Sequence, residues 1–147
     1  MGLWTEAVLI CKLKIDTPEQ VIDMLAYLIS PFGTEPAMNT PSHPFFQQPS
    51  WHMTLAMDCN YFPGETISAL QRDSYDGSGP FHLTIRCKVK YGDLVTGLLR
   101  WLAPYIETQG FVGYRRNDEN EGITLIYVVS DRVVYEEVTS TRRIEIG

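Results

Sequence analysis

Positive charge is scarce in this sequence: 12 lysine and arginine residues stand against 18 aspartate and glutamate residues, and the formal net charge is −6. Proteins that bind nucleic acid through its phosphates usually carry a clustered basic excess. Long apolar runs are also missing. The apolar stretch near the N-terminus is interrupted by Lys12 and Lys14, far short of the ~20 residues of a membrane span. We therefore expect no nucleic-acid partner and no association with a membrane.

Cysteine is equally sparse. The three cysteines are an odd number without C-x-x-C spacing, which argues against a disulfide framework and suits a reducing cytoplasm. The sequence also lacks a P-loop, a Rossmann fingerprint, a nucleophile elbow and a zinc-ligand pattern. On these grounds we expect no cofactor and no metal site.

The composition is that of one globular domain spanning 1–147, with 44% hydrophobic and 20% charged residues. A chain of this length can bury roughly 68–70% of its unfolded surface without disulfides or metals. The Pro-rich stretch 34–51 shows no sustained period, which predicts a long loop that is either functional or poorly ordered.

Three stretches alternate between apolar and polar residues with a period of two, which predicts β-strands. These stretches are 5–15, 53–61 and 81–91. In each of them a cysteine (Cys11, Cys59 or Cys87) falls on the apolar side, which we expect to face the helices. Free cysteine is among the most buried residue types, so core packing is favoured over a metal cage.

Two helices are expected between and after these strands. The first begins at Thr17, which matches a T-x-x-Q capping box with Gln20, and it ends before Pro31. The second begins at Asp93 and is kinked or ended by Pro104. The remaining predictions are a short helical piece with a glycine-rich turn within 63–80 and strands at 111–116, 123–129, 132–138 and 142–146.

The order of these elements favours a ferredoxin-like two-layer α+β sandwich. This β-α-β-β-α-β plan has a mainly antiparallel sheet, and here it would continue into a C-terminal β extension at 132–147. In the arrangement that we expect, the first strand and the strand after Gly122 are neighbours.

Two H-x-T tripeptides open the second and third predicted strands. They resemble the paired H-x-[ST] motifs of the two-histidine phosphoesterases, whose histidines act as general acid and base and whose hydroxyls hold the phosphate. The resemblance implies that His52, Thr54, His82 and Thr84 are catalytic and face one cleft. Histidine titrates near neutral pH and can serve either role.

The relative direction of the two strands decides whether these histidines can act together. In an antiparallel pair, His52 and His82 would lie at opposite ends, roughly 25–30 Å apart at ~3.4 Å per residue. Proton transfer needs contacts of about 3 Å, so only a crossover that makes the strands parallel would serve an enzyme. The same objection applies to a three-histidine metal site with His43, and solvated or hydrogen-bonded histidines are expected instead.

The sheet face that points away from the helices is expected to be partly apolar, at Trp4, Val8 and Ile10 on the first strand and at Ile126 after Gly122. Large uncovered apolar patches are rare on soluble monomers, so something should cover this face. The loop 34–51 supplies three aromatic residues, either as a lid that completes the core or as part of an interface.

The leading hypothesis is therefore a non-catalytic cytoplasmic protein-interaction factor, such as an inhibitor, an immunity-type protein or a regulatory protein. Its partner would be another protein or a second copy of the chain. The expected interaction residues are Trp4, Ile10, Phe45, Phe46, Trp51 and Ile126. The alternatives are a small two-histidine hydrolase and a small-molecule binding module with its ligand under the aromatic loop.

Overall fold

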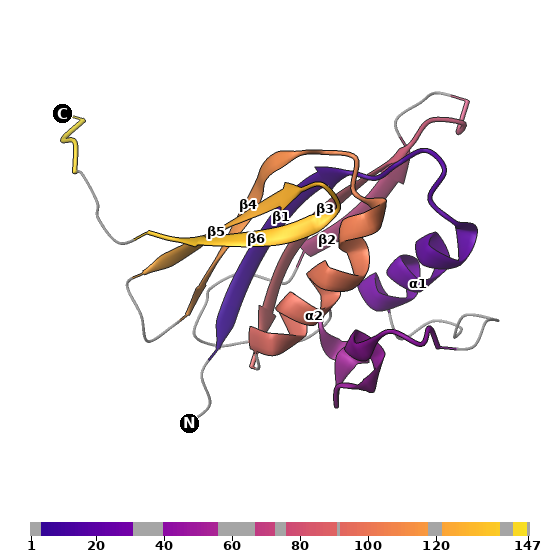
Figure 1. Ribbon diagram of the computed structural model, residues 1–147, viewed down its shortest axis with the longest axis horizontal. Coiled ribbons are helices and arrows are strands. Elements are labelled where there is room, and N and C mark those ends of the chain that lie inside the picture. The colour runs from indigo at the N-terminus through magenta and orange to yellow at the C-terminus, as the bar shows by residue number, and fades with distance from the viewer. Residues whose placement is uncertain are drawn as a thin grey trace.

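The computed structural model describes residues 4–30, 40–55, 67–72, 76–90, 92–117, 122–138 and 143–146. These residues form a mixed α+β fold with a six-stranded antiparallel sheet and two α-helices (Figure 1). The strands are β1 (Thr5–Lys12), β2 (Ile67–Arg72), β3 (Phe81–Val89), β4 (Gly110–Asn117), β5 (Ile123–Val129) and β6 (Arg132–Glu137). The helices are α1 (Glu19–Ile29) and α2 (Gly92–Leu102), with short 3-10 segments η1 (Pro44–Gln47), η2 (Trp51–Met53) and η3 (Ala103–Tyr105).

The strands lie in the order β2-β3-β1-β4-β5-β6, and every neighbouring pair is antiparallel. β1 therefore lies between β3 and β4. The expectation that the first strand neighbours the strand after Gly122 is wrong, because β4 separates β1 from β5. The last three strands form a meander, so the C-terminal half of the sheet is built from successive hairpins.

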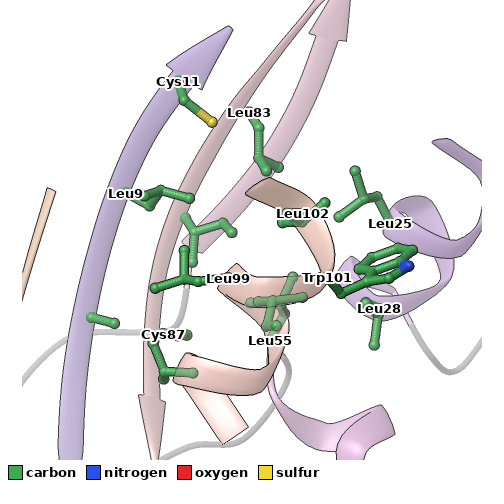
Figure 2. Close-up of a cluster of buried hydrophobic side chains, with 14 of the residues drawn as sticks. Leu9, Cys11, Leu25, Leu28, Leu55, Leu83, Cys87, Leu99, Trp101 and Leu102 are labelled. Carbon is green, nitrogen blue, oxygen red and sulfur yellow. The ribbon is translucent and has the colours of Figure 1, made fainter. Parts of the chain in front are cut away.

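Both helices lie on the same face of the sheet (Figure 1), and the hydrophobic core forms between the two layers. The alternation predicted for the strands is confirmed, because Leu9 and Cys11 of β1 and Leu83 and Cys87 of β3 are buried on the helix side (Figure 2). They meet leucine side chains of α1 and α2 in one cluster. Cys59 lies outside the described residues.

The strand predicted over 53–61 is wrong in the part that the structure describes. Met53 belongs to η2, and residues 54–55 form a turn. The strand that pairs with β3 is instead β2, within the segment for which the sequence predicts helical turns. Packing overrides the alternation here, since Trp51 and Leu55 are four residues apart and both contribute to the core cluster.

The ends of the helices follow the sequence only in part. Pro18 occupies the N-cap of α1 without a side-chain hydrogen bond, so the predicted capping box does not form. The Thr17 hydroxyl donates instead to the carbonyl of Lys14. α2 ends at Leu102 and continues into η3, which contains Pro104, as the proline predicts.

The C-terminal segment differs from its predicted form. The sequence predicts a strand over 142–146, but residues 143–146 belong to no strand and are exposed. Figure 1 shows this segment projecting away from the sheet.

Gly113 fixes the contact between β1 and β4. The pairing register of β4 with β5 shifts between Phe111 and Gly113, which marks a β-bulge. A Cβ atom on Gly113 would lie 1.9 Å from the carbonyl oxygen of Val8, a backbone atom that has no free space to move. Only glycine therefore permits this strand pairing.

We expect Gly113→Ala to lower the free energy of unfolding by about 2–4 kcal/mol, because the added methyl group must push two paired strands apart. Urea unfolding followed by circular dichroism measures the change. Gly122→Ala is the matched control, since nothing lies within 4 Å of its Cβ position, and it should stay within about 0.5 kcal/mol of the parent. Equal effects of the two substitutions would contradict the proposed role of Gly113.

Candidate functional site

The most distinctive surface is the open face, meaning the side of the sheet that points away from α1 and α2. Side chains on this face alternate with the buried residues of each strand. Six large apolar side chains remain exposed there, with exposed fractions between 41% and 63%. They are Ile10, Ile67, Phe111, Ile123, Val129 and Val134.

Two of these six residues, Phe111 and Val134, belong to a row of apolar side chains across the strands, whereas the other four lie opposite polar residues: Ile10 opposite Thr84, Ile67 opposite Arg86, Ile123 opposite Arg116 and Val129 opposite Arg132. Phe111 of β4 lies opposite Tyr127 of β5, with ring centroids 5.9 Å apart, and Tyr127 lies opposite Val134 of β6. A second row joins Val8, Tyr114 and Leu125 across β1, β4 and β5. The two apolar rows therefore span the four neighbouring strands β1, β4, β5 and β6.

A group of charged residues borders the apolar rows on the same face. The Glu6 carboxylate is buried, and it accepts from the Arg116 Nε at 2.6 Å and from the Arg86 Nε at 3.2 Å. Lys88 lies directly across from Glu6 on β3 and is also buried. Two guanidinium groups thus share one buried carboxylate, and a third cationic residue lies on the neighbouring strand.

The two H-x-T motifs lie on opposite sides of the molecule. His52 is exposed in η2, and its ring contacts Trp51, which packs against Tyr27 of α1 in the helix layer. His82 is exposed on β3 and alternates with the buried Leu83, so its side chain points to the open face. The sheet separates the two imidazoles, and they do not share a cleft.

The two threonines of these motifs also lie on different sides of the sheet. Thr54 is fully buried and its hydroxyl donates to the Trp51 carbonyl at 2.7 Å, which stabilises the 3-10 turn. Thr84 is exposed on the open face, opposite Ile10. No shared phosphate position joins them.

The third histidine has a structural role. His43 is the N-cap of η1, and its Nδ1 accepts from the Phe45 N–H at 3.1 Å. Burial, with the nearby positive charge of Arg100 as a second cause, lowers the pKa of His43. Within the described ranges, no group of three or more histidine, cysteine, aspartate or glutamate residues is arranged to hold a metal ion.

The aromatic residues of the loop 34–51 lie in the helix layer. Phe45 and Phe46 are buried against Trp101 of α2 and against Trp51, with ring centroids between 4.9 and 6.4 Å apart. The described part of the loop therefore packs as a lid that completes the core. These three loop aromatics contribute no surface to the open face.

The other expected interaction residues are divided between core and surface. Ile10 is on the open face as expected, and Trp4 precedes β1 and is partly buried. Ile126 is buried in the core instead of lying on the open face. The sequence ITLIYVV is apolar on both sides of β5, so its alternation does not indicate which side faces the helices.

A separate polar cavity of about 470 Å³ lies where the start of α1 approaches the ends of β2 and β3. Its lining includes Lys14, Glu19, Asp23, Arg72 and Phe81. Arg72 stacks over the Phe81 ring at 4.5 Å. None of the aromatic residues of the loop 34–51 lines it.

Comparisons of the chain with protein-family models, with curated proteins and with solved structures find no match. Among the helices that the structure describes, none combines the length and the apolar character needed to cross a membrane.

We expect Glu6→Gln to lower the free energy of unfolding by about 1–3 kcal/mol, because it leaves Arg86 and Arg116 without their buried counter-charge. The estimate allows for solvent screening, since both arginines are more than a third exposed. Glu107→Gln is the control, because Glu107 pairs with Lys12 at the surface. Equal costs in urea unfolding would contradict a structural role for Glu6.

Burial raises the pKa of the Cys11 and Cys87 thiols to about 12. At pH 8 the thiolate fraction would then be on the order of 10⁻⁴, so both thiols should be unreactive in the folded protein. In a Cys59→Ser variant we expect an aromatic disulfide reagent to modify these thiols at least ~100-fold more slowly in buffer than in 8 M urea. Rapid labelling of the folded variant would contradict their burial.

Proposed function

We propose that this protein is a non-catalytic interaction factor that binds another protein through the open face of its sheet. The observation that carries the proposal is the set of six large apolar side chains that stay exposed on that face. Monomeric soluble proteins rarely leave contiguous apolar patches of this kind uncovered. Covering ~400 Å² of such surface is worth on the order of 10 kcal/mol before ordering costs.

The charge of the open face supports a partner with an acidic rim. The side chains of Arg86 and Arg116 are 38% and 45% exposed at the border of the apolar rows. A partner that offers an apolar centre and carboxylates beside it would match both parts of the face. An inhibitor, an immunity-type protein or a regulatory factor would act in this way.

We also propose that the fold is ferredoxin-like and that the protein functions in the cytoplasm. The order β2-β3-β1-β4, with α1 between β1 and β2 and α2 between β3 and β4, supports the first proposal. In this interpretation β5 and β6 are the C-terminal extension. The free thiols of Cys11 and Cys87 support a reducing compartment.

One observation favours a second candidate function, the binding of a small molecule. The cavity beside α1 presents Lys14 and Arg72 together with Glu19 and Asp23, a set that suits a small ligand carrying both charges. The two-histidine hydrolase has no comparable support, because His52 and His82 lie on opposite sides of the sheet.

Ile10→Asp tests the open face, because it places a charge on β1 beside the apolar row that begins at Val8. We expect capture of proteins from the native host by the tagged chain to fall at least tenfold, with an unchanged circular dichroism spectrum. Ile15→Asp is the matched control, since Ile15 is 72% exposed in a turn outside the sheet. The double variant His52→Ala/His82→Ala should leave capture unchanged.

The proposal fails if Ile10→Asp and Ile15→Asp capture the same proteins in the same amounts. Loss of capture in the double histidine variant would point to the hydrolase hypothesis instead.

A further inference from the structure

β6 is an outer strand of the sheet, and in the part of the chain that the structure describes no strand pairs with its far edge. Natural proteins usually protect such an edge with charged side chains (lysine above all), proline, a bulge or a covering segment. The β6 sequence RVVYEE has neither proline nor lysine, its charged residues are of both signs, and its register with β5 is continuous from Arg132 to Glu137. β6 is therefore a regular strand with an edge suited to further pairing.

The turn that precedes β6 determines which of its residues direct their backbone N–H and C=O groups toward β5 and which direct them outward. Ser130 and Asp131 have φ values of 49° and 62°, which define a two-residue hairpin turn. The flanking pair of Val129 and Arg132 then exchanges hydrogen bonds, and the pattern alternates along β6. The bond from the Val138 N–H to the Ile123 carbonyl, at 3.0 Å, fits this phase at the other end.

It follows that the backbone groups of Arg132, Val134 and Glu136 point toward β5. Those of Val133, Tyr135 and Glu137 point outward from the sheet. Outward donors and acceptors at alternate residues are what a second antiparallel strand requires.

The sequence of β6 is complementary to itself in one antiparallel register. When Val134 lies opposite Val134 of a second copy, Arg132 faces Glu136 of that copy and Glu136 faces its Arg132. In the same register Val133, whose backbone groups point outward, lies opposite Tyr135 of the second copy. These two residues then form a hydrogen-bonded pair. A shift of the two-fold axis to Tyr135 would place Arg132 opposite Val138 and remove both charge pairs. Because opposite charges directly across two strands are stabilising, the register centred on Val134 is favoured.

We propose that two copies of this chain associate through β6 in this register and form one continuous antiparallel sheet. The two open faces then lie side by side, with the exposed Val134 residues in contact at the two-fold axis. Because one six-residue strand from each copy makes the contact, the interface is small and we expect a Kd on the order of 1–100 µM. This association does not depend on the open face binding another protein.

Sedimentation equilibrium of the full chain from 1 to 500 µM tests the proposal. We expect a reversible monomer–dimer equilibrium, and we expect Arg132→Glu and Glu136→Arg each to weaken it at least tenfold by placing like charges opposite each other. The double variant Arg132→Glu/Glu136→Arg exchanges the charges and should restore the Kd to within about threefold. Both positions are exposed, and circular dichroism verifies that each variant is folded.

Two results would overturn the proposal. The first is a parent chain that stays monomeric up to 500 µM. The second is a double variant that associates no more tightly than the single variants, which would place self-association on another surface. Ile10→Asp should retain the dimer, so failure of this proposal is distinguishable from failure of the open face as a partner-binding surface.

Discussion

The fold and its exposed surface depend on one constraint: the helices and the aromatic loop all pack on the same side of the sheet. α1, α2 and the aromatic residues of η1 and η2 together bury the inner side chains of the strands. With these elements used on one side, none of the described helices covers the other side. Apolar residues on both sides of β5 and β1 therefore leave an exposed surface of the kind that proteins use for association.

The charged group on the open face would limit which partners could use this surface under the proposed function. A buried carboxylate is costly unless cations and hydrogen bonds compensate it, and Arg86 and Arg116 provide that compensation for Glu6. The two arginines remain partly exposed, so they can reach a second molecule as well. A partner that buried them without supplying carboxylates would lose their hydration, and this disfavours basic or purely apolar surfaces.

The sequence predicts the strands whose two sides differ in polarity and misses the features that depend on tertiary contacts. The alternation around Leu83 is clear because the other side of that strand carries polar residues such as His82, Thr84 and Arg86. The stretch after Trp51 alternates equally well, yet the aromatic contacts of Trp51 hold its start in a 3-10 turn. Local periodicity cannot represent such contacts, because they come from rings outside the alternating stretch, namely Phe45 and Phe46 in η1 and Tyr27 in α1.

The candidate site, too, is only partly predictable from the sequence. Ile10 is recognisable from the sequence, but the charge group is not, since Glu6, Lys88 and Arg116 come from three strands that only the topology brings together. The placement of Phe111 depends on the bulge before Gly113, which shifts the register by one residue and is not encoded in any local pattern.

The outer strand β6 is fixed to the rest of the fold through the side chain of Tyr135. The Tyr135 hydroxyl lies 2.8 Å from the hydroxyl of Thr96 in α2, and the Arg115 guanidinium lies over the Tyr135 ring at 4.7 Å. These contacts use the side chain of Tyr135 and leave its outward backbone groups accessible to a second strand. A strand that is already held in its extended conformation loses little conformational entropy when it pairs. The contacts that fix β6 in one chain would thus lower the entropic cost of the proposed pairing between two copies.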